Sequence, residues 1–246
     1  MLIFGAYVSF YNDKNKEMEK TKVFNVIILD RSGSMECIRQ AAVDGFNETL
    51  VGIKKAQEKF AVTQEHFVSL VTFCSCEIKH VYDKTPVMDA NTLSVDDFCP
   101  CCTTPLYDAM GFTLTAMYKH VKDMEDVVVV VTIITDGMEN ASREYSGKNI
   151  TDLVKRLRGE GWTFTYMGAN QDSIEVAKSM SIRNARNFDY TNASARLSMS
   201  KDANTRMNFF GKLAFVKGVI NPMSVDERRK LYTSMADEAF DEEENR

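Results

Sequence analysis

The sequence contains no apolar stretch long enough to cross a membrane. A membrane-spanning helix needs about 20 consecutive, mostly apolar residues, and every apolar run in this chain is far shorter. The start, Met1 to Phe10, also lacks the basic flank and the cleavage region of a secretory signal. We therefore expect a cytoplasmic protein that does not associate with membranes.

An excess of positive charge is also missing. The chain has 30 lysines and arginines against 35 aspartates and glutamates, which gives a formal net charge of −5. A protein that binds nucleic acid or an anionic lipid surface ordinarily carries a basic patch or stripe. The charge balance therefore argues against nucleic acid as a partner.

The motifs of two common enzyme classes are absent. The chain has neither a phosphate-binding loop of the form Gly-x-x-x-x-Gly-Lys-Ser/Thr nor a nucleophile elbow of the form Gly-x-Ser-x-Gly. The three histidines, His66, His80 and His120, flank expected strands and helices without a paired pattern. We therefore expect a protein that is not an enzyme.

The chain does contain a regular alternation of apolar strands and amphipathic helices. The apolar run 23–29 is typical of a central parallel strand, and apolar residues then recur at steps of three and four from Ile38 to Ile53, which predicts a helix of about six turns. This alternation predicts an α/β fold, a doubly wound and mostly parallel sheet with helices on both faces. The remaining strands are expected at 67–73, 77–82 (an antiparallel edge strand), 127–134, 162–167 and 185–190, and the remaining helices at 105–121, 150–157 and 172–180.

Oxygen-bearing side chains stand where strands of this sheet end or helices begin. In open α/β sheets ligands gather at the carboxyl ends of the strands, and hard oxygen donors suit a small hard cation. Each segment alone is more typical of a turn or a helix cap, but three segments that reach one edge predict a metal site. Its expected ligands are Asp30, Ser32, Ser34, Thr104 and Asp136.

These residues resemble the metal-ion-dependent adhesion site of von Willebrand factor A (vWA) domains, which have a Rossmann-like fold. The motif of that family is Asp-x-Ser-x-Ser, then a Thr, then an Asp. Residues 30–34 and Asp136 match it, and Thr-Pro-Leu-Tyr-Asp-Ala at 104–109 is similar to a form common in bacterial members. The family often has two glycines just before the Thr, whereas this chain has Cys-Cys-Thr at 101–103.

The resemblance implies a divalent ion, Mg²⁺ or else Mn²⁺ or Ca²⁺, held by the serines and the threonine directly and by the aspartates directly or through water. Neutral hydroxyl ligands leave much of the charge of the ion uncompensated, and magnesium keeps waters readily. A carboxylate from another molecule can then take a water position. The implied function is a protein-binding module that captures an Asp or Glu of a partner, and bacterial members often work beside AAA-type ATPases.

The resemblance covers roughly residues 23–190 and divides the chain. We expect an N-terminal extension outside the core at 1–20, a vWA domain at 21–192, and a C-terminal helical extension with an acidic end at 193–246. Within the last part, a patch that runs from Leu213 to Ile220 precedes a charged helix at about 224–240. This region is expected to cover the sheet, with partner docking as the alternative.

The cysteines crowd two of the loops. Cysteine thiolates can bind zinc in a closed tetrahedral site, but neither group has the usual Cys-x2-Cys spacing, so we expect reduced thiols, with zinc and a disulfide or redox switch as alternatives. Cys37 stands apart from both groups. The five loop cysteines are Cys74, Cys76, Cys99, Cys101 and Cys102.

Two other functions stay open. In a magnesium-dependent phosphohydrolase, Asp30 would be the nucleophile, but such a site usually has a second carboxylate two residues on, where this chain has Ser32. In an assembly domain, the metal site would be purely structural. Asp108 and Glu139 lie near the same edge and are expected to be structural caps or solvated residues.

Overall fold

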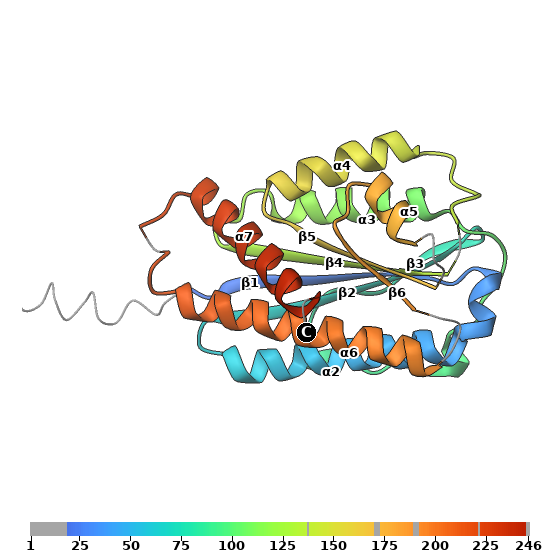
Figure 1. The fold of residues 1–246 in the computed structure, drawn as a ribbon, viewed down its shortest axis with the longest axis horizontal. Coiled ribbons are helices and arrows are strands. Elements are labelled where there is room, and N and C mark those ends of the chain that lie inside the picture. The colour runs from blue at the N-terminus through green and yellow to red at the C-terminus, as the bar shows by residue number, and fades with distance from the viewer. Residues whose placement is uncertain (1–18, 137, 170–172, 189–191, 221, 245–246) are drawn as a thin grey trace, which may run out of the picture.

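A computed structural model, which describes residues 19–136, 138–169, 173–188, 192–220 and 222–244, contains a six-stranded sheet in the order β3-β2-β1-β4-β5-β6 (Figure 1). Strands β1, β2, β4, β5 and β6 are parallel to one another, and β3 is antiparallel to β2 at one edge. The strands are β1 (Thr21–Asp30), β2 (Gln64–Cys74), β3 (Glu77–Pro86), β4 (Val127–Thr135), β5 (Thr163–Gly168) and β6 (Asn184–Asn187).

Helices cover both faces of this sheet. Figure 1 shows α3, α4 and α5 on one face and α2 and α6 on the other. This arrangement confirms the doubly wound, mostly parallel α/β fold with one antiparallel edge strand. The helices are η1 (Gly33–Ile38), α2 (Arg39–Phe60), η2 (Val87–Asp89), η3 (Val95–Asp97), α3 (Leu106–Val121), α4 (Gly147–Gly159), α5 (Ser173–Ser179), α6 (Asn192–Val216) and α7 (Val225–Glu244).

Strand β1 is buried on both faces, because its side chains alternate between two hydrophobic cores. Phe24, Val26 and Ile28 pack in the core that includes α3 and α4. Ile27 and Leu29 pack in the core that includes α2. The apolar run of β1 therefore anchors the residues that follow it to the centre of the molecule.

The elements begin and end within a few residues of the expected positions. The first helix starts as the 3-10 helix η1, so α2 begins at Arg39, and Pro105 directly precedes α3 instead of being its first residue. The edge strand runs past residue 82 to Pro86, with register irregularities opposite Leu70. Asp172 and Tyr190, expected in a helix and a strand, lie outside the described residues.

Helix α6 packs against α2, α7 and the sheet, and α7 also contacts α4. Phe209, Phe210 and Leu213 of α6 join Val23 and Val128 of the sheet in a third hydrophobic core. Because of this packing, the apolar patch expected near the end of α6 is buried in one part and exposed in another. Leu213 and Ile220 are buried, whereas Phe215 is 88% and Val219 65% exposed.

Most of the expected N-terminal extension at 1–20, namely residues 1–18, lies outside the described residues. Within the described part of the chain, no helix has the length and apolar character that a bilayer crossing requires.

Candidate metal site

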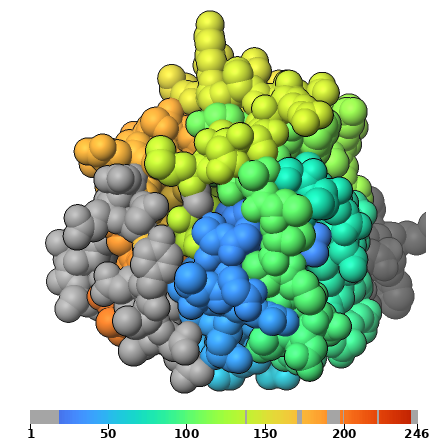
Figure 2. Space-filling view, turned by 90° about the vertical axis from the view of Figure 1, so that its right-hand side faces the viewer, coloured from blue at the N-terminus to red at the C-terminus, as the bar shows by residue number. Residues whose placement is uncertain are grey.

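The expected metal ligands lie at the carboxyl edge of the sheet, beside its topological switch point. Strands β1 and β4 are neighbours, and the chain leaves β1 toward β2 but leaves β4 toward β5. In open α/β sheets ligands bind at such a point. Figure 2 looks onto this edge. The segment after β1 (blue) lies at the centre of that face, between the loop before α3 (green) and the segment that follows β4 (yellow-green).

Asp30, the last residue of β1, is completely buried. Its Oδ1 accepts the backbone N–H of Ser32 at 2.7 Å, and its Oδ2 accepts the hydroxyl of Thr135 at 2.6 Å. Burial raises the pKa of the Asp30 carboxyl to about 6, although these hydrogen bonds act in the opposite direction. The metal-free site therefore disfavours the charged form of Asp30.

The two serines link the first loop to Asp136, which follows β4. The hydroxyl oxygens of Ser32 and Ser34 lie 3.2 Å apart, and the Ser34 hydroxyl donates to Asp136 Oδ1 at 2.8 Å. Ser32 is buried, whereas Ser34 is exposed. Hydrogen bonds thus connect four of the five expected ligands, namely Asp30, Ser32, Ser34 and Asp136. The group reaches the surface at Ser34.

Asp136 has an oxygen without a partner. Its side chain is 5% exposed, and its Oδ2 is buried with no hydrogen-bond partner among the residues that the structure describes. Burial raises the pKa of Asp136, and the bond from Ser34 only partly offsets this effect. An unpartnered buried carboxylate oxygen is costly, and a cation among these oxygens would compensate it. The donor set therefore fits a hard divalent ion.

Thr104 reaches the same edge through the loop that precedes α3. Backbone bonds join this loop to the first one, from Cys101 N to Arg31 O at 2.9 Å and from Gly33 N to Cys102 O at 3.0 Å. Thr104 itself is buried. The second loop therefore stays tied to the Asp-x-Ser-x-Ser loop, although it has cysteines where glycines are common in the resembling family.

Asp108 and Glu139 hold backbone rather than completing the ligand set. The Asp108 carboxylate accepts the N–H groups of residues 143–145 at 2.8 to 2.9 Å. Glu139 accepts the N–H groups of Tyr107 and of residues 141–142 at 2.7 to 2.8 Å. Both carboxylates therefore have the capping role expected for them.

Sequence reasoning missed two residues that position the ligands. Thr135 donates to Asp30, and its place beside Asp136 was the only signal in the sequence. Asn140 binds Thr104 twice, because its Oδ1 accepts the Thr104 N–H at 2.9 Å and its own N–H donates to the Thr104 carbonyl at 3.1 Å. Nothing in the sequence pattern distinguishes Asn140 from an ordinary loop residue.

The loop cysteines come together next to this site. The Sγ atoms of Cys74 and Cys101 lie 3.5 Å apart, and those of Cys76 and Cys102 lie 3.0 Å apart. Cys99 does not join them, since its thiol donates to a backbone carbonyl at 3.4 Å. All six cysteines of the chain lie in the described ranges and are free thiols.

No model of a protein family matches the chain, and no curated protein matches it either. Solved structures do. The pilus adhesin SpaC of Lactobacillus rhamnosus GG, in its open conformation, is 15% identical with a TM-score of 0.57 over 80% of this chain and 31% of SpaC. The SpRpn10 VWA domain is 11% identical with a TM-score of 0.50 over 74% of this chain and 95% of that domain. At such identities the likeness establishes the fold.

Proposed function

Because the chain has the von Willebrand factor A fold, we propose that it is a metal-dependent protein-binding module. It captures an acidic side chain of a partner through a bound divalent ion, with Mg²⁺ as the first candidate and Mn²⁺ or Ca²⁺ as alternatives. The residues that hold the ion are Asp30, Ser32, Ser34, Thr104 and Asp136.

The observation that carries this proposal is the buried Oδ2 of Asp136, which has no hydrogen-bond partner among the described residues. Two buried carboxylates lie at this edge, and the negative charge of Asp136 adds to the burial that raises the pKa of Asp30. A single divalent cation would relieve both effects at once. Among the described residues, no lysine or arginine forms a hydrogen bond or an ion pair with either carboxylate, so a bound ion is the natural source of positive charge.

The mixture of ligands favours recognition of an acidic group. Three of the five proposed ligands are neutral hydroxyls, so the ion would keep a net attraction for another carboxylate. Ser34 is exposed, which gives a partner access to this side of the site. An ion held mostly by buried side chains and open on one side is suited to bridge two proteins.

A polar groove next to the site offers room for the rest of the partner. It has a volume of about 730 Å³ and lies between the turn that joins β2 to β3, the start of α3 and the segment after β4. Thr103, Pro105 and Asn140, which are neighbours or contacts of Thr104, line it. A peptide whose carboxylate reached the ion would therefore have an adjacent surface to contact.

The phosphohydrolase alternative is less well supported. A nucleophilic carboxylate must be reached by its substrate, but Asp30 is completely buried. The position two residues on, where such a site usually has a second carboxylate, is Ser32. A purely structural metal site is the stronger rival, because it would use the same ligands. Dependence of partner binding on the metal separates these two functions.

The experiment is a pull-down with the full chain as bait, in magnesium and in a chelator, with AAA-type ATPases as the first partners to examine. We expect capture in magnesium alone, and loss of capture for Asp30→Ala and Thr104→Ala. The matched control is Thr92→Ala, because Thr92 is an exposed loop threonine that neither belongs to the proposed ligands nor lines the groove. Equal capture by the wild type and both site variants would refute the proposal.

A further inference from the structure

Four cysteines from two distant segments form a compact sulfur cluster beside the candidate metal site. Cys74 is the last residue of β2, Cys76 lies in the turn from β2 to β3, and Cys101 and Cys102 lie in the loop before α3. The sulfur atoms of Cys74, Cys76 and Cys101 all lie within 4.8 Å of one another. The sulfur of Cys102 lies 3.0 Å from that of Cys76.

From this arrangement we infer that Cys74, Cys76, Cys101 and Cys102 form a structural zinc site. Zinc bound by thiolates is tetrahedral with Zn–S distances near 2.3 Å, which places neighbouring sulfurs about 3.8 Å apart. The separations of 3.0 and 3.5 Å are slightly shorter than that value, and Cys74, Cys76 and Cys101 lie within 4.8 Å of one another. Cys102 lies outside this group of three, so its exposed side chain would turn toward the ion to become the fourth ligand. The sequence argued against zinc because neither cysteine pair has the usual Cys-x2-Cys spacing. In the folded chain, however, the two pairs lie next to each other.

The surroundings of Cys74 suit a thiolate. The Arg31 guanidinium lies 3.5 Å from its sulfur, and the N–H groups of Cys76 and Glu77 face the same atom. Burial alone would raise the pKa of Cys74, but the Cys76 N–H, the Cys101 thiol and the Glu77 N–H, with a smaller effect of the Arg31 charge, outweigh it and lower the pKa. A zinc ion with four thiolates carries a net charge of −2, which Arg31 partly balances. Partners of this kind orient and stabilise metal ligands.

The backbone around the cluster is already held in an unusual conformation. Cys102 has a φ of 63°, in the left-handed region that residues other than glycine seldom adopt. Its carbonyl accepts the N–H of Gly33. A Cβ on that glycine would lie 3.3 Å from the same carbonyl oxygen, so the two loops approach closely. Strain of this kind persists where the surroundings over-determine the backbone, and a zinc ion would add such a constraint.

Zinc in this position would fix the loop that carries Thr104. The cluster joins the turn after β2 to residues 101–102, and Thr104 follows two residues later. This role adds a second, closed metal site and does not depend on the function proposed for the first.

The experiment measures metal in the full chain, purified under reducing conditions, and then replaces zinc by Co²⁺. We expect about one zinc per chain and the strong sulfur-to-cobalt charge-transfer absorption of a tetrahedral thiolate site. Cys76→Ser and Cys102→Ser change exposed residues, so their folding is the least at risk. Loss of a residue that only hydrogen-bonds to a metal ligand weakens metal affinity by about 10- to 100-fold. Each of these two variants removes a proposed ligand itself and should weaken zinc affinity by more than that.

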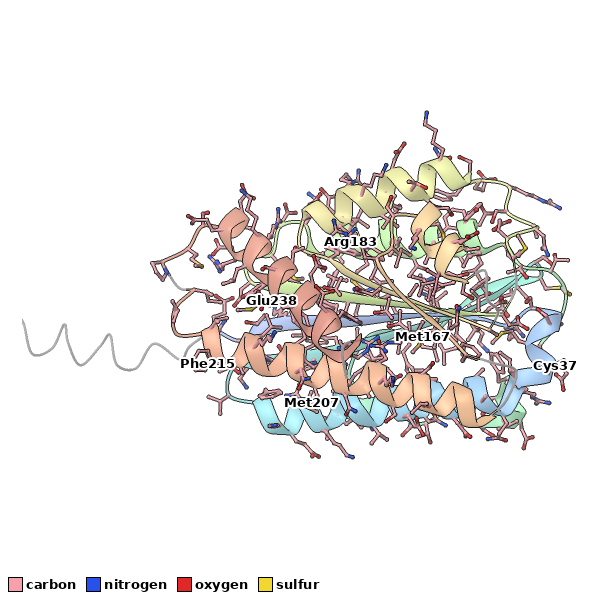
Figure 3. All side chains as sticks on the ribbon, in the orientation of Figure 1. Cys37, Met167, Arg183, Met207, Phe215 and Glu238 are labelled. Atoms are coloured by element: carbon pink, nitrogen blue, oxygen red, sulfur yellow. The ribbon has the colours of Figure 1, made fainter. Side chains whose placement is uncertain are left out.

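Controls come from the other two thiols and from the first site. Cys37 lies on η1 and points outward (Figure 3), and Cys99 is also exposed, so Cys37→Ser and Cys99→Ser should leave zinc content unchanged. Asp30→Asn should also leave the cobalt absorption intact. The inference is wrong if the reduced chain retains no zinc, if it retains iron instead, or if all four cysteines pair as disulfides in the freshly isolated protein.

Discussion

Replacing Asp30 with asparagine removes the charge of a buried carboxylate while keeping its size. Burial raises the pKa of Asp30 from 3.8 to about 6 in the folded protein. Between these values the folded chain holds a proton that the unfolded chain has lost, so the stability of the metal-free protein falls as the pH rises. A shift of about two units corresponds to ~3 kcal/mol at neutral pH.

The assay is thermal or urea unfolding of the wild type and Asp30→Asn, both metal-free, at about pH 4.5 and about pH 7.5. About 2 kcal/mol of the linked free energy falls between these two conditions. The wild type should therefore lose about 4–8 °C in Tm relative to the variant as the pH rises, given the size of the chain. His66, whose pKa burial lowers to about 4, titrates with the opposite effect. It is present in both proteins and cancels in the comparison.

Adding magnesium at about pH 7.5 extends the test. A ligand at 100 times its dissociation constant stabilises the folded state by about 2.7 kcal/mol, so the wild type should recover most of its loss. Asp30→Asn should respond far less. A difference between the two proteins that stays constant with pH would refute the argument that burial penalises the Asp30 charge.

Two further predictions concern stability away from the site. Asp202→Ala should lower the free energy of unfolding, measured in urea, by about 3–5 kcal/mol. The variant leaves the Arg206 guanidinium buried without the carboxylate that lies 2.6 Å away. A loss below about 1 kcal/mol would contradict this role. Gly161→Ala should cost more than about 1 kcal/mol, since Gly161 has a φ of 91° and a Cβ would lie 3.2 Å from the backbone of Arg229. Gly159→Ala is its control, because a Cβ there meets nothing within 4 Å.

Most of the fold could be predicted because its strands are long apolar runs. Strands β1 and β4 are buried on both faces, so their patterns are unambiguous, and the expected bounds at 23–29 and 127–134 lie within two residues of the observed ones. Helix α6 could not be delimited in this way. It packs against α2, α7 and the sheet together, so its apolar residues do not form a single stripe.

The candidate site, like the fold, could be predicted from the sequence only in part. The Asp-x-Ser-x-Ser run is local and visible in the sequence, but it predicted a metal site only together with Thr104 and Asp136. The bonds of Thr135 to Asp30 and of Asn140 to Thr104 join residues 105 and 36 positions apart. The meeting of the cysteine pairs likewise depends on how two loops pack, which no spacing along the chain reveals. Long-range contacts of this kind required the structure.

Titration of the metal-free chain with Mn²⁺, followed by the loss of the free-ion electron paramagnetic resonance signal, tests the central claim most directly. We expect one saturable site at the carboxyl edge of the sheet, for which Mg²⁺ competes. We also expect that Asp136→Ala and Thr104→Ala abolish this site, whereas Thr92→Ala leaves it intact. Manganese binding that survives both site variants unchanged would contradict the account.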